Sequence, residues 1–246
     1  MLTSFEEFAK RVDAICLSDI GNIKKIQTAM VDIEKKHDIP MRVSNNILTQ
    51  YKKCIDVNPL IGFAIMEELR PRELSKYFTE KEIAEFSKER YETVNISFPM
   101  RIPALEVFPD QWIAVLNVRT IMALGNAQLI NYNENVQRVV KRLVENDVEY
   151  WQVDVNRNSV KEIANDLITN KYIPDAITLN IPENSDFDYQ DGALIINDID
   201  AFNITDGYHR YLAMSQSCVM DENFDYPFIV QFTCFSDEKG RRFINQ

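Results

Sequence analysis

The spacing of apolar residues changes near residue 92 of this 246-residue chain, and that change constrains the fold more than any other feature of the sequence. Before it, apolar residues recur at the spacing of one helix face; Phe5, Phe8 and Val12 begin the series. After it, short apolar runs such as Trp112–Leu116 are separated by loop-forming residues, as in β-structure. The sequence therefore predicts a helical module over residues 1–92, followed by an α/β domain over residues 93–246.

Helix start and stop signals divide the first module into several predicted helices. Ser44 is a candidate cap for one of them, and Asn58-Pro59 has the residue types that open another. Thr79–Glu82 has the pattern of a capping box, in which the first and fourth residues satisfy each other's backbone N–H groups. No constellation of catalytic or ligand-binding side chains is visible in these helices. We therefore interpret the module as a protein-interaction or lid region.

The second domain is predicted to mix strands with helices. Asn158 or Ser159 is a candidate cap for one helix, Gly125 closes another, and the polar stretch 184–192 is expected to be a loop. The predicted strands are 94–98, 112–116, 176–181, 193–196, 201–204 and 228–235, and the predicted helices are 118–124, 139–144, 159–168 and a fourth near residue 211.

Composition is that of a soluble globular protein, with 46% hydrophobic and 26% charged residues. The chain has no apolar run of about eighteen residues that could span a bilayer, and its N-terminus lacks the features of a signal peptide. We therefore expect a cytoplasmic protein with no membrane partner. With two histidines and no Cys-x-x-Cys pair, a histidine-rich zinc site is excluded, whereas magnesium bound by carboxylates stays open.

The net charge of −11 is unevenly distributed. Residues 1–92 hold 15 basic and 16 acidic side chains, whereas residues 93–246 hold 12 basic and 22 acidic ones. An acidic domain repels a polyanion over most of its surface, so bulk charge does not support DNA as a partner except through a local basic groove. An acidic surface also suits a protein partner or plain solubility.

The five residues Asp206–Arg210 are the candidate functional motif. They lie between an apolar run that ends at Thr205 and a helical pattern that begins at Tyr211, so the expected order is strand, tight turn and helix. The first N–H groups of a helix lack internal partners, and the helix dipole makes that end positive, which favours a bound phosphate. Gly207 permits a positive φ at the turn and the close approach of a ligand.

The side chains of the motif add chemistry that suits phosphate. Arg210 has a planar guanidinium that matches phosphate oxygens, and His209 can hydrogen-bond a ligand or move a proton near neutral pH. Asp206 can cap the helix, bind a metal ion or accept a hydrogen bond from a ribose hydroxyl. The local pattern also fits an ordinary Asp-Gly turn with a solvated first helical turn, and on its own it favours that plainer interpretation.

The order of elements around the motif resembles that of the DGQHR-domain proteins, the group that contains the DndB-like DNA phosphorothioation proteins, within the wider ParB/sulfiredoxin-like superfamily. The resemblance covers residues 95–246. Tyr208 stands at the variable position of the signature, where Gln or His is commoner. The elements that carry the resemblance are Gln137-Arg138, Arg157–Ala164, Ile173-Pro174 before 176–181, Asp206–Arg210, and 228–235 before Phe243–Asn245.

The resemblance implies an α/β (α+β) fold in which the helical module precedes a ParB/sulfiredoxin-like domain with a small mixed sheet. It also implies a phosphate site at the helix after the signature, where relatives in the superfamily bind ATP or CTP and some hydrolyse it. Other relatives are nucleases, nickases or small-molecule kinases, and DndB-like members are linked to DNA modification, restriction and transcriptional control. Fold alone does not select among these activities.

Our first hypothesis is a nucleotide-binding protein, with weak NTPase activity as one option, in a DNA-modification, restriction or phage-related process. The ligand is ATP or another NTP with magnesium. The phosphates are predicted to contact Arg210 and the N–H groups of Gly207, Tyr208 and His209, while Asp206 positions magnesium or a water molecule. Asp206 and His209 are the candidate catalytic residues.

A second pair of candidates precedes the motif. Arg138 is predicted to make another phosphate contact and Gln137 to hydrogen-bond the base or the ribose, although the same pair fits a helix start with a solvated basic face. The alternative hypothesis is a non-catalytic regulatory protein that binds a protein or DNA partner through residues 1–92. Kinase and nuclease activities are weaker alternatives.

Overall fold

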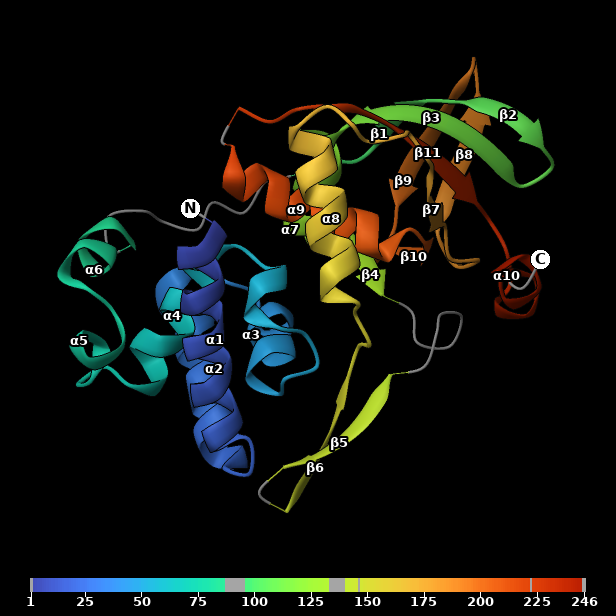
Figure 1. Ribbon diagram of the computed structural model, residues 1–246. Coiled ribbons are helices and arrows are strands. Elements are labelled where there is room, and N and C mark those ends of the chain that lie inside the picture. The colour runs from blue at the N-terminus through green and yellow to red at the C-terminus, as the bar shows by residue number, and fades with distance from the viewer. Residues whose placement is uncertain (1, 87–95, 133–139, 146, 222, 245–246) are drawn as a thin grey trace. The chain divides into compact units, whose positions relative to one another are not determined.

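A computed structural model of the chain describes residues 2–86, 96–132, 140–145, 147–221 and 223–244 (Figure 1). They divide into two compact units: the described parts of 1–93 with 140–154, and those of 94–139 with 155–246. The predicted domain boundary at residues 92/93 lies outside the described residues. Within the described residues, every helix is too short or too polar to cross a lipid bilayer.

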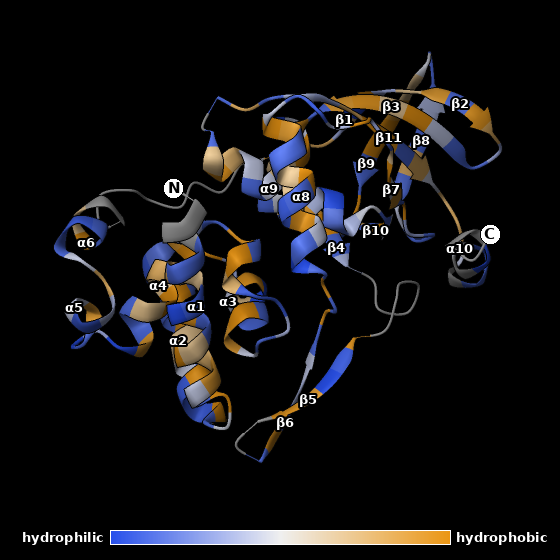
Figure 2. Cartoon of the chain, viewed as in Figure 1, coloured by the Kyte–Doolittle hydropathy of each residue, from blue (hydrophilic) through white to orange (hydrophobic). Residues whose placement is uncertain are grey.

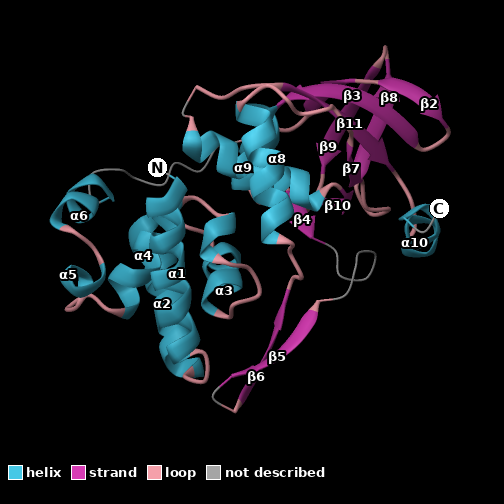
Figure 3. Ribbon diagram, viewed as in Figure 1, coloured by secondary structure: helices cyan, strands magenta, loops and turns pink. Residues whose placement is uncertain are grey.

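The predicted α/β class is confirmed, because a helical N-terminal region precedes a unit built on mixed sheets (Figure 3). Apart from one hairpin, the regular structure described in the first unit is helical. Its helices are α1 (Leu2–Asp19), α2 (Ile23–His37), α3 (Met41–Leu48), α4 (Pro59–Leu69), α5 (Leu74–Tyr77) and α6 (Glu80–Phe86), with a 3-10 turn η1 (Cys54–Asp56) before α4.

Helix α4 lies at the centre of the first unit, where it contacts α1, α2 and α3. Ile65 and Met66 are fully buried, and the helix is apolar on most sides, as expected of a helix surrounded by others. Its start is the predicted one: Asn58 Oδ1 accepts from the Leu60 N–H at 2.9 Å, and Pro59 occupies the first helical position.

The capping box before α6 is also confirmed. The Thr79 N–H donates to Glu82 Oε2 at 2.8 Å, and the Glu82 N–H donates back to Thr79 Oγ1 at 3.2 Å. The prediction that Ser44 caps a helix is wrong. Helix α3 already begins at Met41, after Pro40, and Ser44 is buried within it. Because proline has a φ suited to a helix start, it begins the helix several residues earlier than the serine signal indicated.

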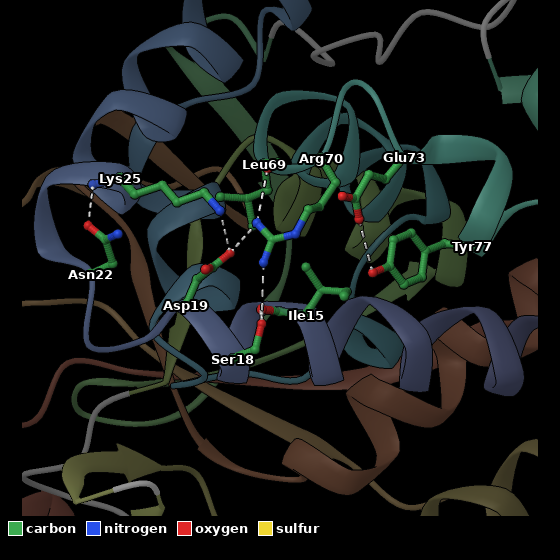
Figure 4. Close-up of polar contacts among 9 residues, drawn as sticks. All are labelled: Ile15, Ser18, Asp19, Asn22, Lys25, Leu69, Arg70, Glu73 and Tyr77. Carbon is green, nitrogen blue, oxygen red and sulfur yellow. Dashed lines mark hydrogen bonds and ion pairs between the residues drawn. The ribbon is translucent and has the colours of Figure 1, made fainter.

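Asp19, at the end of α1, joins the first turn of α2 to the residue that follows α4 (Figure 4). Its Oδ2 lies 2.9 Å from Lys25 Nζ and 2.5 Å from Arg70 Nη1. Partial burial acts to raise the pKa of Asp19, but hydrogen bonds from Arg70 and Lys25 outweigh it and hold the pKa below its usual value. The ion pairs therefore stabilise the helical unit most where Asp19 is ionised.

A hairpin of β5 (Lys141–Glu145) and β6 (Val148–Gln152) belongs to the first unit. The predicted helix over 139–144 is therefore wrong in its described part. Leu143 pairs with Tyr150, which is buried, whereas Val144 is exposed, so the residues alternate between two faces as in a strand. Beyond the hairpin, the Val153 N–H donates to Tyr51 O at 3.2 Å, which attaches this segment to the helical unit.

The described residues of the second unit form a mixed sheet of order β2-β3-β11-β7-β10-β4 and an antiparallel sheet of order β1-β9-β8. In the larger sheet β11 pairs in parallel with β7, and β10 pairs in parallel with β4, while the other neighbours are antiparallel. The strands are β1 (Met100–Pro103), β2 (Leu105–Phe108), β3 (Gln111–Asn117), β4 (Ile130–Tyr132), β7 (Ile177–Asn180), β8 (Asp186–Gln190), β9 (Ala193–Asp198), β10 (Phe202–Asp206) and β11 (Pro227–Thr233).

The core of the second unit forms around β7, whose four residues are all buried. Phe202 and Phe232 meet within it, with ring centroids 5.5 Å apart. Helices α8 and α9 pack side by side in this unit (Figure 1). Strands β2 and β3 are largely hydrophobic (orange in Figure 2), and Leu105, Phe108 and Val115 are exposed there. The helices are α7 (Val118–Asn126), α8 (Arg157–Ile168), α9 (Tyr208–Met220) and α10 (Asp237–Ile244).

Several predicted boundaries in this unit are wrong. The described residues of the strand expected at 94–98 are not in a strand, and β1 begins at Met100. The polar stretch 184–192 contains β8, because its alternating residues pair with β9. Helix α7 continues through Gly125 to Asn126. The cap of α8 is Asn156, rather than Asn158 or Ser159, since its Oδ1 accepts from the N–H groups of both.

Candidate phosphate site at the start of helix α9

The motif Asp206–Arg210 adopts the predicted order of strand, turn and helix. Asp206 is the last residue of β10, Gly207 is the N-cap, and α9 begins at Tyr208 (Figure 1). Gly207 has a φ of 84°, in the left-handed region that favours glycine. Glycine has no side chain, so the N-cap residue itself makes no side-chain hydrogen bond to the positive end of this helix.

Gly207 is also required for space. A Cβ at this position would lie 2.7 Å from Arg210 Nη1 and 2.8 Å from Ile177 Cγ2. It would also lie 3.1 Å from the Cα of Ile177, a backbone atom that cannot rotate away. Glycine therefore allows the turn to pack directly against the start of β7, and this close packing places the first turn of α9 beside the residues that precede β7.

Arg210 connects the first turn of α9 to the chain before β7. Its Nη1 donates to Ala176 O at 2.5 Å, and its Nη2 lies 2.6 Å from Asp175 Oδ2. Asp206 Oδ2 lies 3.3 Å from Nη1. The Arg210 side chain is 19% exposed, while Asp175 and Asp206 are 66% and 58% exposed. The guanidinium is thus held by two carboxylates that reach it from the solvent side.

His209 is oriented by a backbone group from before α8. The Asn156 N–H donates to His209 Nε2 at 2.9 Å. Asn156 itself is held by its role as N-cap, because its Oδ1 accepts from the N–H groups of Asn158 and Ser159 at 3.2 and 3.3 Å. Neither Asn156 nor Asp175 was predicted from the sequence as a site residue. Asn156 lies two residues before the predicted cap candidates Asn158 and Ser159, and Asp175 is a single aspartate after a proline.

The side chain of Tyr208 belongs to the core rather than to a surface site. It is 7% exposed, and its ring lies 4.8 Å from that of Tyr132 and 6.2 Å from that of Tyr211, measured between centroids. Tyr132 is the last residue of β4, which runs parallel to β10. The two strands therefore end at the same edge of the sheet, the edge at which ligands bind in many α/β proteins.

Gln137 and Arg138 lie outside the described residues, so their predicted contacts stay predictions. In the described part of the chain no group of three or more His, Cys, Asp or Glu side chains is arranged to hold a metal ion. The described contact of the Asp206 carboxylate is with Arg210. The groups that this site offers to a phosphate are thus the helix start and an arginine that is already paired.

A pair of stacked aromatic residues lies next to this site. Tyr172, after α8, stacks on Phe228 with ring centroids 5.5 Å apart. Partial burial raises the pKa of the Tyr172 hydroxyl, and the positive charge of Arg210 opposes that rise. The tyrosine thus stays protonated at neutral pH and acts as a packing group beside the arginine.

The motif lies in a segment of the chain that is similar to a known protein family. Residues 113–230 match the DndB family, described as DNA-sulfur modification-associated, and that segment includes Asn156, Asp175 and Asp206–Arg210. The SPbeta prophage-derived uncharacterized protein YopQ of Bacillus subtilis (strain 168) is 26% identical over 196 residues. The similarity covers 73% of this chain and 42% of YopQ, so the chain spans less than half of that relative's length.

No solved structure matches the chain significantly, and the ParB/sulfiredoxin-like architecture therefore stays a prediction. The matched segment begins within β3, ends within β11, and includes α8 and the strand, turn and helix of the motif. Through residues 113–230, the chain is similar to the DndB family of DNA-sulfur modification-associated proteins.

Proposed function

We propose that the second unit binds a phosphate-bearing ligand, ATP or another NTP with magnesium, at the start of α9, and acts in a DNA-modification process. The family description, DNA-sulfur modification-associated, supports the process. The prophage origin in the name of YopQ fits a phage-related setting. The geometry around Gly207 supports the class of ligand.

The observation that carries the proposal is the conformation of Gly207. Its φ of 84° turns the chain directly from β10 into α9, and glycine at the N-cap places no side chain over the helix start. A helix of 13 residues directs its dipole and its first N–H groups at that point. An anion bound there gains both interactions, which is why helix starts after glycine turns recur as phosphate sites.

Arg210 is the second component of the proposed site. Arg210 pairs with Asp175, whose carboxylate is exposed to solvent. Such exposed ion pairs contribute at most about 1 kcal/mol to the free energy of unfolding. A phosphate that carries two negative charges and accepts two parallel hydrogen bonds is a stronger partner for a guanidinium. We therefore propose that phosphate displaces Asp175 from Arg210, while the bond to Ala176 O keeps the side chain in place.

Thermal unfolding with ATP, CTP and GTP, each with and without magnesium, tests this proposal. A ligand at a hundred times its dissociation constant adds about 2.7 kcal/mol to the free energy of unfolding. We expect a nucleotide-dependent rise in Tm for the native protein and its loss in Arg210→Ala. Arg242→Ala is the matched control, since it removes the same charge from the exposed surface of α10, where Arg242 pairs with Glu238. An unchanged rise in Arg210→Ala would overturn the assignment.

A second candidate function is a regulatory protein without catalysis, and a specific observation favours it. The three motif side chains that were predicted to act in chemistry or phosphate binding are engaged: His209 Nε2 by the Asn156 N–H, and Arg210 by the carboxylates of Asp175 and Asp206. Phosphate release from ATP, measured over hours with and without a DNA duplex that contains phosphorothioate linkages, separates the two functions. Binding without release supports the regulator, and release that is lost in Asp206→Asn supports the enzyme.

A further inference from the structure

The two histidines of the chain have opposite hydrogen-bond partners at the same ring nitrogen. His37 Nε2 lies 3.0 Å from Glu68 Oε1, whereas His209 Nε2 lies 2.9 Å from the backbone nitrogen of Asn156. Hydrogen bonds from Lys36 and His37 outweigh partial burial and lower the pKa of Glu68, so this carboxylate is ionised and only accepts. The Nε2 of His37 therefore carries a proton.

The partner of His209 imposes the reverse arrangement. A backbone N–H is only a donor, so the nitrogen that faces it must offer a lone pair. Turning the ring over would place a carbon atom against the Asn156 N–H and leave that donor without this acceptor. The hydrogen bond thus fixes both the orientation of the ring and the position of its proton, which must be on Nδ1 in the neutral imidazole.

We infer that Asn156 is a positioning residue that holds His209 as a neutral imidazole with its proton on Nδ1, so that His209 orients a ligand by donation and does not act as a base through Nε2. For its role toward a ligand, this inference rests on the proposed phosphate site at α9. It decides between the two roles that the sequence left open for His209, orientation of phosphate and proton transfer. Asn156 acts through its backbone, and its side chain keeps that backbone in place.

The local structure explains why the donor is well positioned. The Asn156 side chain caps α8 through the N–H groups of Asn158 and Ser159, and its carbonyl accepts from the Val160 N–H at 3.2 Å. Helix α8 packs along α9, the helix that carries His209. The N–H of Asn156 is therefore fixed on one helix and its acceptor on the other, within one unit. A hydrogen bond between two such fixed groups loses little entropy when it forms.

Long-range ¹H–¹⁵N spectra of the full chain labelled with ¹⁵N-histidine test the inference directly, at a mildly alkaline pH. His37 supplies an internal reference, assigned by its loss in His37→Gln. We expect His37 to carry its proton on Nε2 and His209 to carry its proton on Nδ1, the tautomer that is less common for histidine in water. A native spectrum with the His209 proton on Nε2 would overturn the inference, and this outcome requires no variant to fold.

Two substitutions at one position separate the backbone from the side chain. Asn156→Ala removes the cap but keeps the N–H, whereas Asn156→Pro removes both, and the native φ of −76° suits proline. We expect His209 to stay in the Nδ1–H form in Asn156→Ala and to shift mainly to Nε2–H in Asn156→Pro. The same tautomer in both variants contradicts a role for the Asn156 N–H.

Ligand binding provides the last readout. The amide of His209→Asn keeps a donor near the Nδ1 position, whereas the amide of His209→Gln lies near the Nε2 position, so we expect the dissociation constant for ATP with magnesium to rise more in His209→Gln, about tenfold against about threefold. An equal loss in both contradicts the inference. If ATP fails to bind the native protein while His209 holds its proton on Nδ1, the proposed function fails and the positioning of His209 stands.

Discussion

Asp175 and Arg210 form an ion pair of 2.6 Å that joins two segments 35 residues apart, the residue before Ala176 and the first turn of α9. The pair has an asymmetric environment, because the Arg210 side chain is 19% exposed and that of Asp175 is 66% exposed. Arg210 is also held by Ala176 O, whereas Asp175 projects into solvent. An incoming anion therefore competes with Asp175 and leaves the arginine in place.

Removing the charge of Asp175 is expected to strengthen phosphate binding. In Asp175→Asn the guanidinium keeps its bond to Ala176 O but loses a competing carboxylate, and a surface ion pair of this kind corresponds to about 0.2–1 kcal/mol, or a change in affinity of up to about fivefold. The dissociation constant for ATP, measured by calorimetry, should fall by that factor. Asp110→Asn is the control, because Asp110 pairs with Lys239 and its loss changes the net charge equally. An equal gain in both variants would assign the effect to net charge alone.

Gly207→Ala is expected to destabilise the second unit strongly. The substitution places a side chain in the left-handed region, at about 1–2 kcal/mol, and forces its Cβ against Ile177, which adds about 1–3 kcal/mol. Gly192→Ala separates the two terms, because Gly192 has a φ of 69° and a Cβ there meets no atom within 4 Å. Unfolding in urea should show a loss of about 1–2 kcal/mol for Gly192→Ala and clearly more for Gly207→Ala. Equal losses would mean that packing against Ile177 contributes nothing.

The features that were predicted correctly from the sequence are local ones. The turn at Gly207 and the capping box at Thr79–Glu82 were predicted correctly because a few adjacent residues encode each of them. The contacts of Arg210 with Asp175 and of His209 with Asn156 were not predicted, since these partners lie 35 and 53 residues away and no local pattern indicates such a pairing.

Short strands were the commonest source of error in the fold. Leu143-Val144 fits a helix as well as a strand when the partner strand is ignored, and only pairing with 148–152 decides in favour of β5. Strand β8 was taken for a loop because Asp186 and Asp188 make it polar; it pairs with β9 and alternates exposed aspartates with half-buried aromatic residues. Tertiary pairing therefore overrides local propensity at these places.

The stability of the helical unit is expected to depend on the ionisation of Asp19. Its pKa in the folded state lies below the ordinary value of 3.8, so the stabilisation is fully present above that value and is lost as the pH falls through the lower, folded pKa. Asp19→Asn should therefore cost about 1–2 kcal/mol at neutral pH. Urea unfolding followed by circular dichroism at several pH values should show this deficit shrink toward strong acid.

In the same unit, the pKa of Asp13 is shifted in the opposite direction to that of Asp19. Burial raises its pKa above 3.8, and the Cys54 N–H, the Lys53 charge and the Gln50 amide offset that rise only in part. Ionised Asp13 therefore disfavours folding above the folded pKa, and this cost disappears as the pH falls through that pKa toward 3.8. Relative to the native protein, Asp13→Asn should be at its most stable near neutral pH and lose that advantage in acid. If Asp13→Asn and Asp19→Asn respond to pH with the same sign, the assignments of burial and ion pairing are wrong.

Substitutions at Gly125, in α7, and at Tyr211, in α9, test how these two helices pack against each other. A Cβ on Gly125 would lie 2.1 Å from Tyr211 Oη and 3.1 Å from its Cζ, so Gly125→Ala should cost about 1–3 kcal/mol although alanine favours a helix by about 1 kcal/mol. Tyr211→Phe removes the atom that collides. In that background we expect Gly125→Ala to be close to neutral, which gives a coupling free energy of at least about 1 kcal/mol in a double-mutant cycle. A cost that is the same in both backgrounds would mean that the hydroxyl does not limit the approach of the two helices.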